Sequence, residues 1–271
     1  MARVLFDPHF AQAWQHRCDL GQDVATYPWT EPSGGWGITR KLAFALAHLG
    51  RMRNSKPRLQ SVCDLLVALG LEPAFPENEL PAPPDRDEVE IIVTGSRLKA
   101  FTDDEIATLV RFAEEGGGLL IMSNHGAPEG APNDFTRYDR PLVEKFDIEL
   151  ECTGFSEPNR SRAVHVSGEH PTTTGIRELS INNCSSLRCA RVPSVVDIPS
   201  NWHDRLTGTQ ARGRAAAIAI DEGIDGRVFV LSDSGFMGNE GTRSPGPGLI
   251  DQADNRKFLT NVFSWLAKID T

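Results

Sequence analysis

The sequence predicts one α/β domain in which helices cover both faces of a mixed, mostly parallel sheet. Two observations carry this prediction. Residues 88–94 and 118–122 are apolar strands joined by an amphipathic helix, which makes a β-α-β unit with parallel strands. Residues 214–220 and 227–232 are two further strands separated by a short turn, which makes a late antiparallel hairpin. The chain has no internal repeat, so we assign residues 1–271 to a single domain.

The first part of the chain supplies one edge of the sheet and one helical layer. Residues 3–6 predict a short buried strand, which Pro8 stops because proline has no N–H to donate. Amphipathic helices are predicted at residues 38–49 and 58–69, and each ends at a glycine. An edge strand is predicted near residues 71–75.

A long segment, residues 10–37, lies between the first strand and the first helix. It holds Trp14, Trp29 and Trp36 among prolines and glycines. Loops of this length are uncommon in compact domains and often serve as lids or binding loops. The segment therefore predicts either a lid over a site or a set of aromatic side chains that cap the core.

The helix of the β-α-β unit has clear ends. Thr102 is a good N-cap, and Glu105 three residues later completes a capping box. Glycines 116–118 end the helix and lead into the next strand. The second half adds three regular elements, at residues 140–146, 148–152 and 255–269. Residues 153–213 are less periodic and predict an irregular insertion, with short strands at residues 163–166 and 192–198.

Charge and composition exclude several classes of function. The formal net charge of −9 disfavours general binding to nucleic acid or to an anionic membrane, because phosphate binding depends on clustered Lys and Arg. No apolar run approaches the ~20 residues that span a bilayer, and the first residues lack the apolar stretch of a signal peptide. The sequence has no P-loop and no dinucleotide-binding glycine pattern, so we expect no nucleotide cofactor.

The cysteines indicate the compartment. Five of them, at positions 18, 63, 152, 184 and 189, form an odd number at irregular spacings. No second Cys or His pair gives the spacing of a structural zinc site. Reduced thiols in a cytoplasmic protein account for this pattern most simply. The sequence predicts a small-molecule ligand as the partner and leaves the oligomeric state open.

Polar residues follow four of the predicted strands. They are Asp7 and His9 after the strand at residues 3–6, Thr94 and Ser96 at the end of the strand at 88–94, Asn124 and His125 after the strand at 118–122, and Asp233 and Ser234 after the hairpin. If the strands are neighbours, these side chains converge at one edge of the sheet, where ligands of open α/β sheets usually bind. Burying several polar groups together is costly unless they are paired or used, so the combination favours a site.

Two kinds of chemistry fit this set. In the first, a divalent metal ion activates water for hydrolysis, and its ligands are Asp7, His9, His125 and Asp233. In the second, a histidine paired with an aspartate is the general base, and Ser96 or Ser234 is the nucleophile. Backbone N–H groups near Gly126 or Gly235 then stabilise an oxyanion. The residues expected to contact the substrate are Asp7, Asn124, Gly126, Ser234, Asn239, Trp29 and Trp36.

Each residue taken singly also fits a structural role. His9 and His125 fit as hydrogen-bonded structural histidines, and Asp7 and Asp233 fit as caps of neighbouring turns or helices. A serine without a nucleophile-elbow motif is more often structural than catalytic. The glycine-rich loops 126–130 and 235–248 fit as plain turns as well as donors to an anionic ligand.

Three segments of the chain resemble the class I glutamine amidotransferase-like superfamily. They are residues 4–9, residues 101–120, and residues 226–234 with the following 254–259. The pair His170-Pro171 followed by Gly175 is also similar to that group. The resemblance is to the branches that include trehalose-utilisation-type proteins and a domain attached to gliding and transport proteins. It implies a flavodoxin-like three-layer sandwich with a site at the strand ends.

One departure from the superfamily pattern decides against its usual reaction. Working amidotransferases place a Cys nucleophile on a tight strand-to-helix turn, with a His and a Glu downstream. The comparable corner here is Ser123-Asn124-His125-Gly126, which holds no cysteine. The leading hypothesis is therefore an enzyme that acts on a small polar molecule by hydrolysis or a related acid–base step. The alternative is a non-catalytic module of the same fold that binds a sugar or a partner protein.

Overall fold

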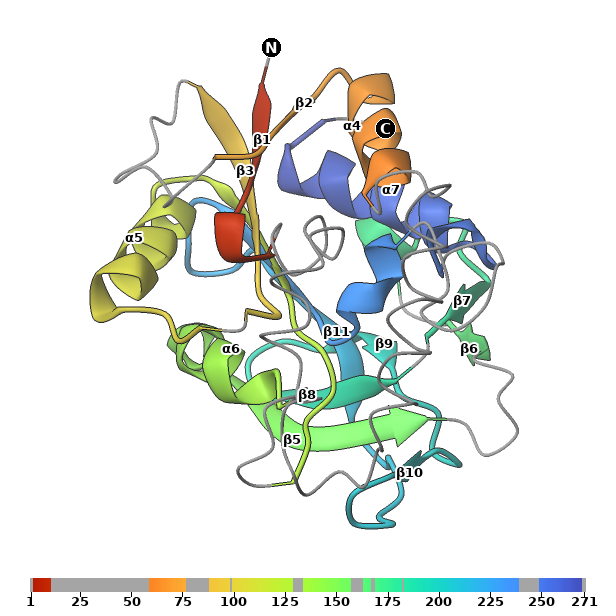
Figure 1. Ribbon diagram of the computed structural model, residues 1–271. Coiled ribbons are helices and arrows are strands. Elements are labelled where there is room, and N and C mark those ends of the chain that lie inside the picture. The colour runs from red at the N-terminus through yellow and green to blue at the C-terminus, as the bar shows by residue number, and fades with distance from the viewer. Residues whose placement is uncertain are drawn as a thin grey trace, which may run out of the picture.

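The computed structural model describes residues 2–10, 59–76, 88–97, 99–128, 134–156, 163–166, 169–181, 183–238 and 249–269. These residues form a mixed α/β domain built on one large sheet (Figure 1). Its strands are β1 (Arg3–Phe6), β2 (Glu72–Ala74), β3 (Val89–Thr94), β4 (Gly118–Met122), β5 (Ile148–Ser156), β8 (Cys184–Cys189), β9 (Ser194–Asp197), β10 (His203–Asp204), β11 (Ala215–Ile220) and β12 (Arg227–Leu231). The order across the sheet is β10-β5-β8-β11-β12-β4-β3-β1-β2, and β9 also pairs with β11.

The parallel half of the sheet contains β12, β4, β3, β1 and β2. The parallel pairing of β3 with β4 confirms the β-α-β unit, and the antiparallel pairing of β11 with β12 confirms the late hairpin. The predicted strand near residues 71–75 is β2, and it lies at the sheet edge beside β1. Pro73 suits that position because an edge strand does not need every N–H in the ladder.

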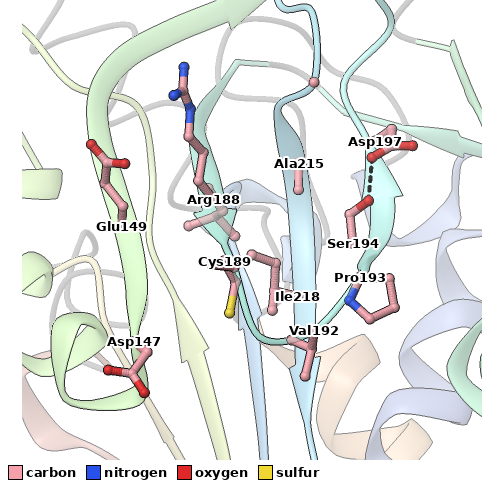
Figure 2. A pocket seen from close by; sticks show the side chains of 13 residues that line it. Asp147, Glu149, Arg188, Cys189, Val192, Pro193, Ser194, Asp197, Ala215 and Ile218 are labelled. Atoms are coloured by element: carbon pink, nitrogen blue, oxygen red, sulfur yellow. Dashed lines mark hydrogen bonds between the residues drawn. The ribbon is translucent and has the colours of Figure 1, made fainter.

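The antiparallel half of the sheet differs more from the sequence prediction. Figure 2 shows four of its strands, marked by Glu149 of β5, Arg188 of β8, Ala215 of β11 and Ser194 of β9. Residues 153–213 supply short strands as expected, and the strand predicted at residues 192–198 is β9. The same segment also supplies β8, which joins the main sheet between β5 and β11. Two further strands, β6 (Ala163–His165) and β7 (Glu178–Ser180), pair in a separate small sheet.

Helices cover both faces of the sheet, as the sequence predicts. One face carries α5 (Asp103–Glu114) and α6 (Thr136–Val143), and α6 continues into the 3-10 turn η4 (Glu144–Phe146). The other face carries α4 (Gln60–Ala68) and α7 (Asn255–Leu266) (Figure 1). The helix predicted at residues 140–146 begins four residues earlier, and Pro141 lies inside it. The structure also contains the 3-10 turns η5 (Pro171–Thr173), η6 (Ser234–Met237) and η7 (Leu249–Asp251).

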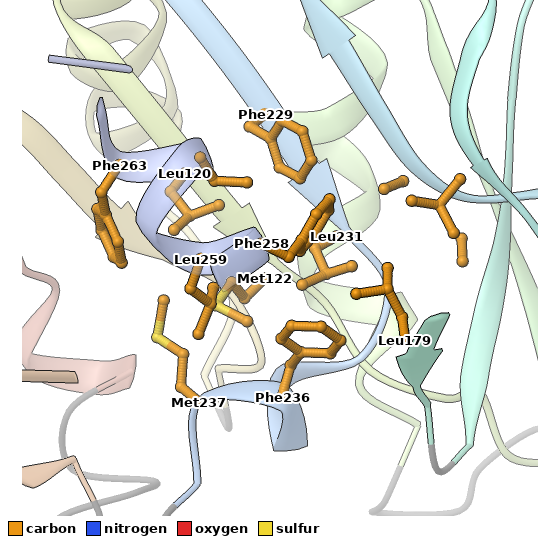
Figure 3. Close-up of a cluster of buried hydrophobic side chains, with 14 of the residues drawn as sticks. Leu120, Met122, Leu179, Phe229, Leu231, Phe236, Met237, Phe258, Leu259 and Phe263 are labelled. Carbon is orange, nitrogen blue, oxygen red and sulfur yellow. The ribbon is translucent and has the colours of Figure 1, made fainter. Parts of the chain in front are cut away.

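The central strands alternate between two hydrophobic cores. In β4, Leu120 and Met122 face α7, whereas Leu119 and Ile121 face α5. Both sets are buried, which explains why the strand is a continuous apolar run rather than an alternating one. Figure 3 shows the α7 side, where Phe258 meets the ring of Phe229 edge to face at 5.8 Å. Each fully buried side chain of this size contributes roughly 1.5–3 kcal/mol.

The local signals of the β-α-β helix are also confirmed. The Thr102 hydroxyl accepts from the Glu105 N–H, and the Glu105 carboxylate accepts from the Thr102 N–H, which completes the predicted capping box.

Residues 11–50 lie outside the described residues, and with them the predicted lid-like segment, the helix at 38–49, Trp29 and Trp36. Asn239 also lies outside them. Within the described part of the chain, no helix has the length and apolar character needed to cross a bilayer.

Candidate functional site

The order of the sheet brings the four polar strand ends together. Strands β12, β4, β3 and β1 are consecutive and parallel, so their carboxyl ends share one edge. We call this the carboxyl edge. It holds Asp233 and Ser234 after β12, Asn124 and His125 after β4, Ser96 after β3, and Asp7 and His9 after β1. The predicted adjacency of these strands is therefore confirmed, and what the residues do there depends on their contacts.

Both carboxylate oxygens of Asp7 have partners within the protein. Its carboxylate is buried, and Oδ1 accepts the His9 N–H at 2.9 Å. Oδ2 accepts the Thr94 hydroxyl and lies 3.4 Å from Nε of Arg97. Asp7 therefore ties the end of β1 to the end of β3, and its two oxygens face inward.

Arg97 is a central residue of this edge that sequence reasoning missed. Its side chain is 1% exposed, and Nη2 donates to Oε1 of Glu105 at 2.7 Å. The guanidinium also lies over the ring of Phe101, 4.0 Å from its centroid. Burial raises the pKa of Glu105, but hydrogen bonds from Arg97 and from the Thr102 N–H outweigh it and bring that pKa to about 2. The sequence holds one signal for this residue, because Arg97 directly follows the Gly95-Ser96 pair at the end of a predicted strand.

The turn after β3 has an unusual backbone. Gly95 has φ 106° and Ser96 has φ 45°, both in the left-handed region. The Ser96 N–H donates to Oδ2 of Asp139 at 2.9 Å, and its hydroxyl donates to the Met122 carbonyl at 2.9 Å. The hydroxyl that was predicted as a nucleophile therefore binds a backbone carbonyl of the neighbouring strand.

Replacing Gly95 with alanine is expected to destabilise the protein by about 3 kcal/mol, because a left-handed φ and a steric contact both oppose the new side chain. A Cβ there would lie 2.6 Å from the Met122 carbonyl oxygen. Gly208→Ala is the matched control, because Gly208 has φ +74° and open space around it. We expect about 1 kcal/mol for the control. Equal losses in urea unfolding would show that the contact with β4 does not matter.

Asn124 links the ends of β4 and β12. Its Nδ2 donates to the Ser234 hydroxyl at 2.8 Å, and its Oδ1 accepts the His125 N–H at 2.7 Å. The His125 ring lies edge to face with Phe135 at 5.6 Å, and its Nδ1 is 2.9 Å from the Gly126 carbonyl oxygen. The two histidines of the edge thus have different surroundings, since His9 lies beside Asp7 and Arg97.

The two predicted oxyanion donors are already used. The Gly126 N–H donates to the Thr153 carbonyl at 2.7 Å, which joins the β4 corner to β5. The Gly235 N–H donates to Oδ1 of Asp233 at 2.9 Å, where Asp233 is the N-cap of η6. Through Oδ1, Asp233 therefore has the structural role considered above, as the cap of a neighbouring turn.

The predicted metal ligands have partners within the protein. Among the residues that the structure describes, no three His, Cys, Asp or Glu side chains are grouped so that they could hold a metal ion. Asp7 contacts Thr94 and Arg97, and the Asp233 side chain accepts the Gly235 N–H at the start of η6. The metal set of Asp7, His9, His125 and Asp233 stays a prediction, and its two carboxylates accept hydrogen bonds from groups of the protein itself.

Both histidines of the carboxyl edge are neutral bases at pH 7. Burial lowers the pKa of His9, and the positive charge of Arg97 lowers it further against the opposing charge of Asp7. Burial likewise lowers the pKa of His125, which the Gly126 carbonyl partly offsets. Both side chains, like Asn124, are partly exposed. The exposed cations Lys99 and Arg205 lie close enough to lower the pKa of His9 and of His125, respectively.

The motif His170-Pro171 followed by Gly175 has a structural role. The His170 side chain accepts from the Thr172 N–H and caps η5, and its ring lies edge to face with Trp265 at 5.1 Å. Gly175 has φ +66°, and Nζ of Lys257 donates to its carbonyl at 3.0 Å. These contacts attach η5 to α7 and place the motif outside the carboxyl edge.

Solved structures of similar fold come from varied proteins. The mmIFT52 N-terminal domain is 15% identical with a TM-score of 0.58, and the match covers 79% of this chain and 92% of that one. The cytoplasmic protein STM1381 from Salmonella typhimurium LT2 is 14% identical with a TM-score of 0.53, covering 80% and 89%. A protein described as thua-like from Bacteroides uniformis ATCC 8492 is 13% identical with a TM-score of 0.46, covering 98% and 90%.

These likenesses bear on the fold alone. The first two show that other solved proteins share this α/β arrangement, and the third is too distant to add to that. No curated protein matches the sequence. One protein family does match, over residues 75–263, a range that runs from the end of β2 into α7 and includes most of the carboxyl edge. This chain belongs to that family, which is described as a domain of unknown function, DUF4350.

Proposed function

We propose that this chain is a non-catalytic binding module of the amidotransferase-like class, with a flavodoxin-like three-layer core. Its carboxyl edge binds an uncharged polar molecule of the sugar class. Helices on both faces of a largely parallel sheet support the first part of the proposal. The absence of a cysteine from the Ser123–Gly126 corner supports a branch that lacks the amidotransferase reaction.

One observation carries the non-catalytic assignment. The groups that a reaction would need at this edge are hydrogen-bonded within the protein. The Ser96 hydroxyl donates to the Met122 carbonyl, and the Gly126 and Gly235 N–H groups have acceptors of their own. Activation of a serine requires a base that accepts from its hydroxyl, and the Ser96 hydroxyl donates to the Met122 backbone carbonyl instead.

The charge of the accessible groups supports an uncharged ligand. Arg97 and Asp7 are buried against each other, so their charges are compensated inside the protein. His9, Asn124 and His125 are partly exposed and uncharged at pH 7, and they offer both donors and acceptors. Hydroxyl groups of a sugar match such a mixed set of donors and acceptors.

A second candidate function rests on the same histidines. The lowered pKa values of His9 and His125 keep both imidazoles unprotonated at pH 7, which a general base requires. An acid–base enzyme that acts on a small polar molecule is therefore the alternative. It would hydrolyse its substrate with water activated by one imidazole, without a covalent step on serine.

The test compares binding with turnover in the same set of variants. We expect neutral mono- and disaccharides, among them trehalose, to raise the melting temperature of the full chain, and matched sugar phosphates serve as the comparison. His9→Ala and His125→Ala should each weaken binding in calorimetry about threefold to tenfold, the value of one hydrogen bond. His203→Ala, at an exposed position of β10, is the control and should bind as the wild type does.

The outcomes separate the two candidates. Binding that falls in both variants, with no turnover of any saccharide, supports the binding module. Turnover that disappears in either variant supports the enzyme instead. Saccharide binding that is unchanged in both variants would exclude the carboxyl edge as the site in either case.

A further inference from the structure

One contact places the proton of the neutral His125 imidazole. Nδ1 of His125 lies 2.9 Å from the Gly126 carbonyl oxygen. A carbonyl oxygen only accepts hydrogen bonds, so Nδ1 carries the proton in this contact. Burial lowers the pKa of His125, so the ring is neutral at pH 7 and holds a single ring N–H. Because that N–H is on Nδ1, Nε2 is an acceptor with no proton to donate.

His170 has the opposite tautomer, also for a local reason. The Thr172 N–H donates to Nδ1 of His170 at 3.3 Å, and a backbone N–H cannot accept. Burial lowers the pKa of His170 as well, so its neutral ring carries the proton on Nε2. The chain therefore contains an internal reference for the tautomer of His125.

Nε2 of His125 has no hydrogen-bond partner among the residues that the structure describes. The side chain is partly exposed, and it lies where the loop after β4 meets β5 through the bond from the Gly126 N–H to the Thr153 carbonyl. We call this place the His125 corner. It presents a fixed hydrogen-bond acceptor that only an incoming donor can satisfy.

A second acceptor without a donor lies beside the His125 corner. Oδ1 of Asn183 is buried and has no hydrogen-bond partner in the described part of the chain. A Cβ built on Gly154 would lie 3.3 Å from this oxygen and 3.9 Å from Cβ of His125, so the two side chains flank the same glycine. The corner is thus short of hydrogen-bond donors, which favours a ligand that brings them.

An aromatic ring lies on another side of the corner. The Phe135 ring is nearly perpendicular to the imidazole, with an interplanar angle of 88° and a centroid distance of 5.6 Å, and Phe135 is partly exposed. Small-molecule sites combine aromatic surface with a few placed polar groups in this way. The nearby charges of Arg205 and Asp134 act on the imidazole in opposite directions. These surroundings suit an uncharged ligand with both C–H and hydroxyl groups.

We propose that Nε2 of His125 selects a ligand hydroxyl that donates its proton, while Phe135 packs against neighbouring C–H groups of the same ligand. This inference rests on the binding function proposed for the carboxyl edge and specifies how that edge recognises a sugar. A donating hydroxyl is lost when it is replaced by hydrogen or by fluorine, because neither can donate. An accepting hydroxyl is partly retained in the fluoro form. Recognition by Nε2 therefore requires that both replacements weaken binding.

The tautomer is tested first, without a ligand. Nitrogen-15 NMR of the full chain at pH 7 distinguishes a protonated from an unprotonated imidazole nitrogen. We expect the proton on Nδ1 in His125 and on Nε2 in His170. A proton on Nε2 of His125, or the tautomer mixture of a free imidazole, would overturn the inference whatever the protein binds.

Recognition is tested by calorimetry with methyl α-D-glucopyranoside, one half of trehalose, and with its singly deoxy and fluorodeoxy forms. We expect one hydroxyl at which both replacements weaken wild-type binding about threefold to tenfold, the value of one hydrogen bond. His125→Asn keeps a donor for the Gly126 carbonyl but has no group at the Nε2 position. It should therefore bind the three forms equally and as weakly as the wild type binds the deoxy form.

Two further variants separate the acceptor from the shape of the corner. His125→Gln carries an amide group at about the Nε2 position, so it should bind the parent glycoside more tightly than His125→Asn does. Phe135→Leu leaves the acceptor in place, so it should weaken binding of all three forms by the same factor. Urea unfolding of each variant checks that the chain remains folded.

The possible failures are distinguishable. If the neutral saccharides do not bind the wild type, the function proposed for the carboxyl edge fails and this inference fails with it. If they bind, but His125→Asn discriminates the deoxy and fluorodeoxy forms as the wild type does, only the inference fails, because another group then accepts the hydroxyl proton.

Discussion

Replacing Asp7 with alanine is expected to lower the free energy of unfolding at pH 7 by about 3–5 kcal/mol, the usual cost of removing one partner of a buried ion pair. Arg97 is 1% exposed, so its charge would lose one of two carboxylates without gaining water in exchange. The Thr94 hydroxyl and the His9 N–H would lose their acceptor as well. Urea unfolding of the variant and the wild type measures the loss directly.

A double-mutant cycle separates the charge from the shape. Asp7→Asn keeps an acceptor oxygen and the volume of the side chain, so it should cost less than Asp7→Ala. Arg97→Met removes the buried charge, and adding it to Asp7→Ala should recover part of the loss, with a coupling of about 1–3 kcal/mol. Losses that simply add, or a loss below about 1 kcal/mol for Asp7→Ala, would show that the pair does not hold β1 to β3.

The parallel half of the fold could be predicted from the sequence, because the patterns that indicate its elements are local. Thr102 and Glu105 form a capping box from adjacent backbone, and the run Gly118–Met122 is apolar because both faces of the sheet are covered. The hairpin of β11 and β12 follows from two apolar runs and a short turn. None of these elements needs knowledge of a distant residue.

Strand β8 was not predicted, and its composition explains why. It has the sequence Cys-Ser-Ser-Leu-Arg-Cys, in which Ser185 and Ser186 are fully buried. The Ser186 hydroxyl contacts Thr153 at 2.9 Å and also donates to Glu151, so its burial is compensated by residues of the neighbouring strand β5. A strand that buries small polar residues leaves no apolar period in the sequence.

The sequence predicts the position of the candidate site, but it does not predict the contacts that the residues there make. Strand-end positions follow from the fold, so Asp7, Asn124 and Asp233 could be assigned to one edge before the structure was known. The partners of those side chains come from elsewhere in the chain. Arg97 and Asp139 engage Asp7 and Ser96, and nothing in the spacing of the sequence indicates that they do. These partners are remote in the sequence, so only the folded chain shows them.

Asp139 is expected to make the protein less stable as the pH rises from about 4 to about 7. The side chain is fully buried on α6, and burial raises the pKa of its carboxyl group to about 7 against the opposing Ser123 hydroxyl, the Ser96 and Arg97 N–H groups and the Arg97 charge. The unfolded chain loses this proton near the ordinary pKa of 3.8, whereas the folded chain keeps it until about pH 7. Below the unfolded value both states are protonated, and the group contributes its full stability there.

The expected pH dependence from Asp139 can be tested with the matched variant Asp139→Asn. A shift of about three pKa units corresponds to about 4 kcal/mol, lost between about pH 4 and pH 7 and constant above it. Asp139→Asn cannot ionise and keeps an oxygen for the Ser96 N–H, so it should remove this slope and be the more stable protein at pH 8. Asp139→Ala also removes the slope but leaves that N–H without its acceptor, so it should be less stable than Asp139→Asn at every pH. Urea unfolding at pH 5 and pH 8 gives the answer, and parallel stability profiles for the wild type and Asp139→Asn would rule out ionisation of this buried carboxyl. If the two profiles instead converge at pH 5 and diverge at pH 8, then the ionisation of Asp139 sets the stability. Asp139 is the side chain that joins α6 to the Gly95-Ser96 turn.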